Sequence, residues 1–258
     1  MSDIIVRENT SVDVQRNNSP MGFENFDTDI VIVPRAKVMQ GLSPELQEDD
    51  CDFRMGDIIH SLLLEKLPET FVPITMWNSR TMFVPRSNDK KKAFWDAIGL
   101  PESDTMWVCR SLNGKTPDTE VLGFANCRDC PYSKFGWDGN ESTPPLCTHT
   151  INCLAVFDGQ DMPVVIQFAN TNFKNGRKFA SMALYGGGAI FSKKYKITSK
   201  KEQNEQGVYY TTPVKPAGKP STEEIALAKK LYEQFSGVAI EVEEENFATD
   251  EFAATTDY

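Results

Sequence analysis

Residues 153–168 read CLAVFDGQDMPVVIQF, which is two apolar runs joined by a polar turn. Each run, residues 153–157 and residues 164–168, has the length of an ordinary strand and is rich in the residues that strands favour. The Asp-Gly pair at the start of the turn is a common signal for two antiparallel strands joined by a short loop. We therefore predict a β-hairpin over these residues.

Further strands are predicted on both sides of this hairpin. The segment FVPITMWNSRTMFV, residues 71–84, has β-type composition and predicts one or two strands. Residues 190–198 and 208–214 alternate between apolar and polar side chains around a polar turn, so they predict a second hairpin. Residues 29–40 begin as an apolar run and predict a strand that Pro34 interrupts. Two segments fit either a strand or a helix: residues 56–65 and residues 173–184.

Two helices have clear start and stop signals. Residues 88–98 predict a short helix that Ser87 or Asn88 caps and Gly99 ends. The sequence Ser-Thr-Glu-Glu at residues 221–224 is a capping box, and the amphipathic helix that it opens ends at Gly237. Many short strands with two or three helices favour a β-rich α+β fold, a barrel with peripheral helices.

The chain is expected to hold one core and two mobile ends. The first residues are polar without an apolar period, and the last are acidic, as is typical of disordered segments. The predicted parts are an N-terminal arm, residues 1–28; a core, residues 29–219, with a metal-binding insertion at about residues 124–154; a helix, residues 220–237; and an acidic tail, residues 238–258.

The charge is distributed unevenly along the 258 residues. The net charge is −10, but residues 71–220 carry 19 basic and 13 acidic side chains. The flanking segments are acidic: residues 1–70 carry 6 basic and 14 acidic side chains, and residues 221–258 carry 2 and 10. A basic middle between acidic ends suggests a site for a polyanion together with an acidic tail.

The chain shows no membrane or export signal. No apolar run approaches the roughly 20 residues that span a bilayer, and the first 20 residues lack the apolar stretch of a secretory signal. We therefore expect a cytoplasmic protein without a membrane partner, in which cysteines serve as metal ligands or free thiols before disulfides.

Four cysteines have the spacing of a structural metal site. Cys127 and Cys130 form one Cys-x-x-Cys half-site, and Cys147 and Cys153 supply the second half after a loop that is poor in apolar residues. His149 lies between the last two and is an alternative ligand. Four protein ligands leave no open position, so the predicted ion is a structural zinc.

Other interpretations of these cysteines stay open. Cys153 begins an apolar strand and suits a buried core thiol equally well. The Cys-x-x-Cys pair also fits a redox dithiol, although the residues after it show no helical pattern. Cys51 and Cys109 are isolated in the sequence and look like ordinary thiols.

Basic and aromatic residues alternate in the second half of the core. Residues 164–219 carry ten basic and two acidic side chains. Cations for phosphates and flat rings for unpaired bases are what a single-stranded nucleic acid needs. Taken singly, each ring fits a core position and each lysine fits a solvated face. The predicted interface comprises Trp77, Arg80, Phe173, Lys174, Arg177, Lys178, Lys193, Lys194, Tyr195, Lys196, Tyr209 and Tyr210.

Several segments resemble a known family. The chain is similar to single-stranded DNA-binding proteins of tailed phages over about residues 29–215. The similar segments are PRAKVMQGLSPE, GDIIHSLLLEKLPETFVPI, CRDCPYSKFGWDGNESTPPLC and GVYYTTPV. The resemblance implies an OB-like barrel, a role in phage DNA replication or recombination in the host cytoplasm, and an acidic tail that docks on partner proteins. It also supports metal binding by Cys127, Cys130 and Cys147.

Two other functions compete with this one. A metal-dependent nuclease or recombinase would need catalytic motifs, but the sequence lacks a His-Glu-x-x-His motif, a phosphate-binding Gly-rich loop and a nucleophile elbow. A protein that inhibits a host factor through acidic ends does not explain the basic middle. We therefore expect a binding protein and not an enzyme.

Overall fold

The computed structural model describes residues 33–47, 51–119, 121–204, 207–237, 240 and 242. The chain divides into two units, residues 1–31 and residues 32–258, and every described residue belongs to the second. The predicted N-terminal arm and most of the predicted acidic tail lie outside the described residues.

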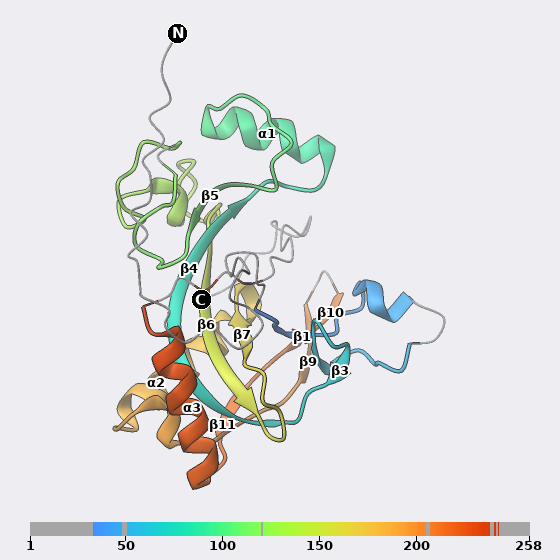
Figure 1. The fold of residues 1–258 in the computed structure, drawn as a ribbon. Helices are drawn as coiled ribbons and strands as arrows, with labels where there is room; N and C mark the ends of the chain where they lie inside the picture. The colour runs from blue at the N-terminus through green and yellow to red at the C-terminus, as the bar shows by residue number, and fades with distance from the viewer. Residues whose placement is uncertain are drawn as a thin grey trace, which may run out of the picture. The chain divides into compact units, whose positions relative to one another are not determined.

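Strand β4 (Thr70–Phe83) is the centre of the main sheet, and Figure 1 shows it as a long, curved ribbon. β6 (Thr148–Phe157) pairs with β4 in antiparallel orientation along most of its length. β7 (Val164–Phe168) pairs in turn with β6. The hairpin predicted from residues 153–168 is therefore confirmed.

The other edge of β4 is shared by two strands. β8 (Tyr195–Ile197) pairs with its first residues, and β5 (Trp107–Ser111) pairs with its last residues. β11 (Val214–Pro216) extends the sheet beyond β8, so the order is β11-β8-β4-β6-β7 with β5 beside β4. All these pairings are antiparallel.

Helices cover both faces of this sheet. On one face, α2 (Phe173–Tyr185) places Phe179 in a core with Phe71 and Phe168. On the other face, α3 (Thr222–Phe235) places Leu231 in a core with strand residues Val72, Ile74, Leu154, Val156 and Val165. Successive residues of a strand point to opposite faces, so a strand between two helical layers is apolar throughout.

The prediction of a barrel is wrong, whereas the prediction of a β-rich fold with helices is confirmed. The strands in the described part of the chain form open sheets, with β7 at one edge and β11 at another. The continuous apolar run of residues 153–157 indicates burial on both faces. A strand of a barrel whose outer face is exposed to solvent would instead alternate between apolar and polar residues.

Two smaller sheets account for the ambiguous and alternating segments. β1 (Ala36–Val38), β2 (Ile58–His60) and β3 (Glu65–Lys66) form one antiparallel sheet, so the ambiguous segment 56–65 contains β2, a turn at residues 61–64 and the first residue of β3. β9 (Lys200–Asn204) pairs with β10 (Gly207–Thr211) in the same register as β8 with β11. The second predicted hairpin thus forms as two ladders with a break between them, but its first residues, Ile190–Ser192, form a 3-10 turn and not a strand.

The two capped helices form where they were predicted. α1 (Asn88–Ile98) follows Ser87 and ends at Gly99, whose φ of 70° is left-handed. In α3 both hydrogen bonds of the capping box are made, from Glu224 N to Ser221 Oγ and from Ser221 N to Glu224 Oε2. α1 packs against the end of β4 in a third core cluster. Within the described residues, no helix has the length and apolar character needed to cross a membrane.

Candidate functional site

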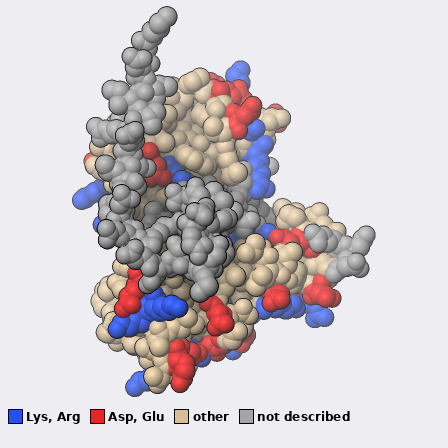
Figure 2. All heavy atoms as spheres, in the orientation of Figure 1, with Lys and Arg blue, Asp and Glu red and all other residues tan. Residues whose placement is uncertain are grey.

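The lysines predicted as phosphate contacts in the second hairpin, Lys193, Lys194 and Lys196, bond to other parts of the chain. Lys194 Nζ lies 2.8 Å from Asp158 Oδ1 and 2.7 Å from Glu224 Oε1. Lys196 pairs with Glu69, and Lys193 donates to the Gly186 carbonyl. Figure 2 likewise shows Lys and Arg side chains interspersed with Asp and Glu on the face in view. This part of the predicted interface offers little uncompensated positive charge.

The aromatic residues of the same region are mostly buried or bonded. Tyr195 is only 1% exposed and packs edge-on against Phe179 at 4.9 Å between ring centroids. It is a core residue, which corrects its prediction as a stacking ring. Tyr209 donates its hydroxyl to Glu202 at 3.2 Å. The backbone of Tyr210 bonds in both directions to the side chain of Gln40.

The outer face of α2 is different. Lys174, Arg177 and Lys178 are all exposed, and within the described residues none of them forms an ion pair. Two large side chains near the end of the same helix are also exposed, Leu184 by 76% and Tyr185 by 85%. The sequence alone does not identify either as exposed, because residues 173–184 fit both a strand and a helix. We call these five residues the α2 face.

The N-terminus of α2 favours anions. Its first turn contains no acidic residue, and the side chain of Asn172 at the N-cap does not cap the helix backbone, although it accepts a hydrogen bond from the Asn175 side chain. The side-chain amide of Asn172 bonds twice to Thr212: Nδ2 donates to the Thr212 hydroxyl, and Oδ1 accepts from the Thr212 backbone N–H. Lys174 in that first turn is disfavoured by the helix dipole by about 0.3–1 kcal/mol. The positive end of the helix dipole and the cations of α2 both attract anions, so their effects on an anion bound there add.

Trp77 and Arg80 point to opposite faces of the sheet. Arg80 pairs with His149 across β4 and β6, and the ring of His149 packs at 4.7 Å on Phe173 of α2. Burial, followed by the charge of Arg80, lowers the pKa of His149 to about 4. Arg80 is therefore on the side of α2, and Trp77 is on the side of α3, so the two do not form one surface.

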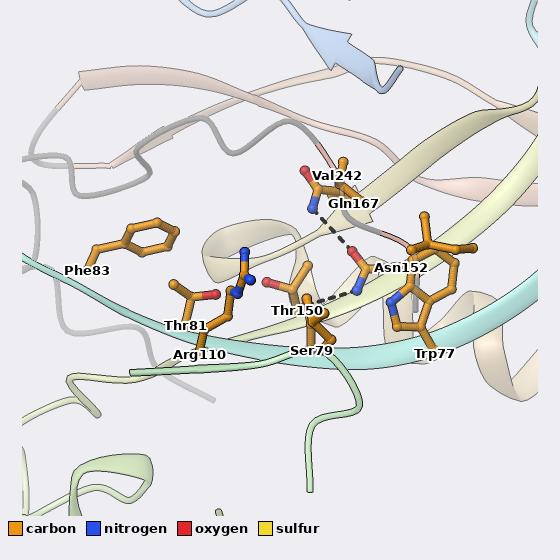
Figure 3. A pocket seen from close by; sticks show the side chains of 11 residues that line it. Trp77, Ser79, Thr81, Phe83, Arg110, Thr150, Asn152, Gln167 and Val242 are labelled. Carbon is orange, nitrogen blue, oxygen red and sulfur yellow. Dashed lines mark hydrogen bonds between the residues drawn. The ribbon is translucent and has the colours of Figure 1, made fainter. Parts of the chain in front are cut away.

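Trp77 lines a small polar pocket on that second side. Figure 3 shows Asn152 between Ser79 and Gln167, bonded to them at 2.9 and 3.2 Å. Arg110 lines the same pocket, and Gln167 Oε1 is buried without a hydrogen-bond partner. The cavity of about 40 Å³ is far below the roughly 300 Å³ of a ligand pocket, so it has room for water and not for a nucleobase.

The cysteines do not group as predicted. Cys127, Cys130 and Cys147 line one cavity of about 20 Å³, and the fourth thiol there belongs to Cys109 of β5. Cys153 points into the core between the sheet and α2 and is completely buried. His149, the alternative ligand, is also absent from the lining. The sequence alone does not place Cys109 beside these thiols, because its neighbours depend on the pairing of β4 with β5.

Backbone contacts tie the cysteine segments together. Cys127 N donates to Lys115 O at 2.7 Å, and Cys147 N donates to Tyr132 O at 3.0 Å. Ser133 Oγ lies 2.8 Å from the carbonyl oxygens of both Cys127 and Cys130. These bonds hold the half-site of Cys127 and Cys130 next to the start of β6.

The thiols share an apolar environment. Burial raises the pKa of Cys109 to about 11 and that of Cys147 to about 12, and the neighbouring thiols contribute to both shifts. Arg80 acts in the opposite direction on the pKa of Cys147. In the described part of the chain, no three His, Cys, Asp or Glu side chains already stand in a metal-binding arrangement.

A family model described as Pam3 phage gp34-like protein matches residues 7–241 of the chain. No curated protein and no solved structure matches it. The match covers the main sheet, the helices α1, α2 and α3, and the cysteine segment.

Proposed function

The chain belongs to the Pam3 phage gp34-like family, and from this premise we propose that it binds single-stranded DNA in phage DNA replication or recombination. The observation that carries the proposal is the α2 face, with three exposed cations that no carboxylate in the described residues neutralises. We place the protein among binding proteins and not among enzymes.

Charge compensation separates α2 from Lys194, Lys196 and Lys200 of the second hairpin. A lysine already paired with a carboxylate, as Lys194 is, gives up that partner when it binds a phosphate, so its net gain is small. Lys174, Arg177 and Lys178 lie within two turns of one helix and have no such carboxylate among the described residues. Their binding to phosphates releases counterions from the strand, which supplies most of the affinity of nonspecific binding.

Tyr185 is the ring best placed for a base on this face. It is 85% exposed, while Tyr195 is buried and Phe173 packs against His149. Stacking of an unpaired base on an aromatic ring contributes roughly 1–3 kcal/mol and tolerates any sequence. Bases in duplex DNA are already stacked on each other, so we expect single strands to bind more tightly than duplex.

The proposal is tested with a triple variant, Lys174→Ala, Arg177→Ala and Lys178→Ala. We expect weaker binding to a labelled oligonucleotide in fluorescence anisotropy. The log–log salt slope should be flatter by about 0.7 for each phosphate that the protein no longer neutralises, or about 2 in total. The wild-type protein should also prefer a single strand to duplex of the same length.

The matched control removes three other exposed lysines that form no ion pair within the described residues, by Lys215→Ala, Lys219→Ala and Lys230→Ala. It changes the net charge by the same amount but lies on β11, on the loop before α3 and on α3, so affinity and salt slope should stay near the wild-type values. Equal thermal unfolding of all three proteins shows that the fold is intact. Equally weakened binding by both variants would reject the α2 face as the interface, and no binding by the wild type would reject the function.

A further inference from the structure

We infer that Cys109, Cys127, Cys130 and Cys147 together bind one structural zinc ion. The four thiols come from three distant places in the chain, namely β5, the turn before Pro131 and the start of β6. All four line the same cavity. The inference goes beyond the proposed function and does not depend on it.

The sheet brings two of the thiols to one place. Cys109 pairs with Met82 on one edge of β4, and Cys147 immediately precedes Thr148, which pairs with Thr81 on the other edge. Side chains alternate along a strand, so Cys109 and Cys147 fall on the same face of the sheet. The half-site of Cys127 and Cys130 then lies over that face, held by the bond from Cys147 N to Tyr132 O.

The size and lining of the cavity fit a metal ion. About 20 Å³ is room for a single water-sized occupant, which suits one metal ion. The lining contains four thiols and no carboxylate or imidazole among the described residues. Four sulfur ligands in tetrahedral geometry are the typical set for structural zinc, with Zn–S distances of about 2.3 Å.

The surrounding segment needs an organiser. Between β5 and β6, within the described residues, the only helical or strand element is the single turn Pro131–Ser133. Few residues of this segment reach a core, since Leu122, Tyr132 and Leu146 are the ones that pack at the edge of the third cluster. A metal that binds four points of such a segment contributes its binding free energy directly to folding.

The thiols must reorient to form the site, since no three ligands among the described residues already stand in a metal-binding arrangement. Rotation about one χ1 torsion redirects each thiol between staggered positions without moving the backbone. Cys153 cannot join by such a rotation, because its side chain lies within the core that contains Phe71 and Tyr195. His149 is likewise held against Phe173 of α2.

Three variants of the full chain decide which cysteines bind the ion. We expect about one zinc per chain by elemental analysis of unchelated wild-type protein, and the disappearance of most of it in Cys109→Ser. Cys153→Ala is expected to keep the zinc, as is the control Cys51→Ser, whose thiol bonds locally to Phe53. Cobalt substitution should give the ligand-field bands of a tetrahedral four-thiolate site in every variant except Cys109→Ser.

A fourth variant covers the case in which Cys109→Ser does not fold. Cys109→His keeps a zinc ligand at that position, so it should restore the metal but shift the cobalt spectrum to that of a site with three thiolates. The inference is overturned by wild-type protein without zinc, by a disulfide among the four cysteines in intact-mass analysis, or by Cys109→Ser that retains zinc with an unchanged cobalt spectrum. A Cys153→Ala protein without zinc, beside a Cys109→Ser protein that keeps it, would also overturn the inference.

Discussion

Gly176 sets how closely α2 approaches the sheet. It is buried, and a Cβ built on it would lie 2.5 Å from Phe168 Cβ and 3.3 Å from Ile151 Cβ. Alanine is better than glycine in a helix interior by about 1 kcal/mol, so propensity alone predicts that Gly176→Ala stabilises the protein. The contact with β7 predicts the opposite, because overpacking a core costs roughly 1–3 kcal/mol.

We expect Gly176→Ala to lower the free energy of unfolding by roughly 1–3 kcal/mol in urea titrations, because the clash outweighs the gain in propensity. The control is Ala180→Gly, one turn further along α2, which should show only the propensity cost of about 1 kcal/mol. If Gly176→Ala is more stable than the wild type, α2 does not pack on β7 as closely as described.

The residue-scale errors of the sequence analysis have one origin. Cys127 and Cys130 are identifiable from sequence because their spacing is local, and the chain between them can only form a tight turn. Cys109 escapes notice, and Tyr195 is wrongly predicted as a surface ring, because their surroundings come from strands far away in sequence. Periodicity shows which residues share a face, but it does not show which strand will lie beside them.

At the scale of elements, local signals were reliable. The capping box of α3, the left-handed Gly99 after α1 and the β6–β7 hairpin formed where the sequence placed them. Each depends on hydrogen bonds between residues close in the chain. The barrel was wrong because closure depends on which edges meet, and the run of residues 153–157 instead indicated helices on both faces.

Lys194 connects three elements through its ion pairs. Lys194 is the residue immediately before β8. Its side chain reaches Asp158 at the β6–β7 turn and Glu224 in α3. We expect Lys194→Ala to lower the free energy of unfolding by about 1 kcal/mol at pH 7, measured by urea titration. Lys200→Ala is the control, since it removes only an exposed pair with Glu202 in its own strand and should have a smaller effect.

The effect of Lys194→Ala should depend on pH in a defined direction. The hydrogen bond from Lys194, ahead of the backbone bond from Ser221, lowers the pKa of Glu224. A carboxyl group with a lowered folded pKa stabilises the fold above its unfolded pKa of about 4.3, and this contribution disappears as the pH falls through the folded value. The difference between wild type and variant should therefore shrink below about pH 4. A constant difference from neutral to strongly acidic pH would contradict the ion pair with Glu224.

At the scale of the whole molecule, the proposed binding of a polyanion has to be reconciled with a net charge of −10. The pairing of Lys194, Lys196 and Lys200 with carboxylates lowers the uncompensated charge of the second hairpin, whereas the three cations of the α2 face have no such pair among the described residues. Residues 243–258 add six acidic side chains and no basic one. An acidic segment on the same chain would compete with DNA for the cations of α2, and we expect this competition to weaken binding most at low salt.

Truncation after Val242 tests this competition with little harm to the fold. It keeps Ile240, which is 7% exposed, and the bridge between Val242 and Val33. We expect tighter binding to a single strand at low salt, and a gain that fades above about 0.1 M salt, where the Debye length falls below about 10 Å. A full-length variant with the six acidic residues of this segment changed to Asn and Gln should gain as much, because the effect is one of charge and not of length.

The α2 variant separates a competing tail from one that acts elsewhere. In the background of Lys174→Ala, Arg177→Ala and Lys178→Ala the truncation should gain little affinity, since the cations for which the tail competes are gone. A gain of equal size in that background would show that the tail acts at another place on the molecule. If the truncation raises the affinity for DNA in neither background, the tail does not compete with DNA. Removing six negative charges would then have left the electrostatic potential at the α2 face unchanged.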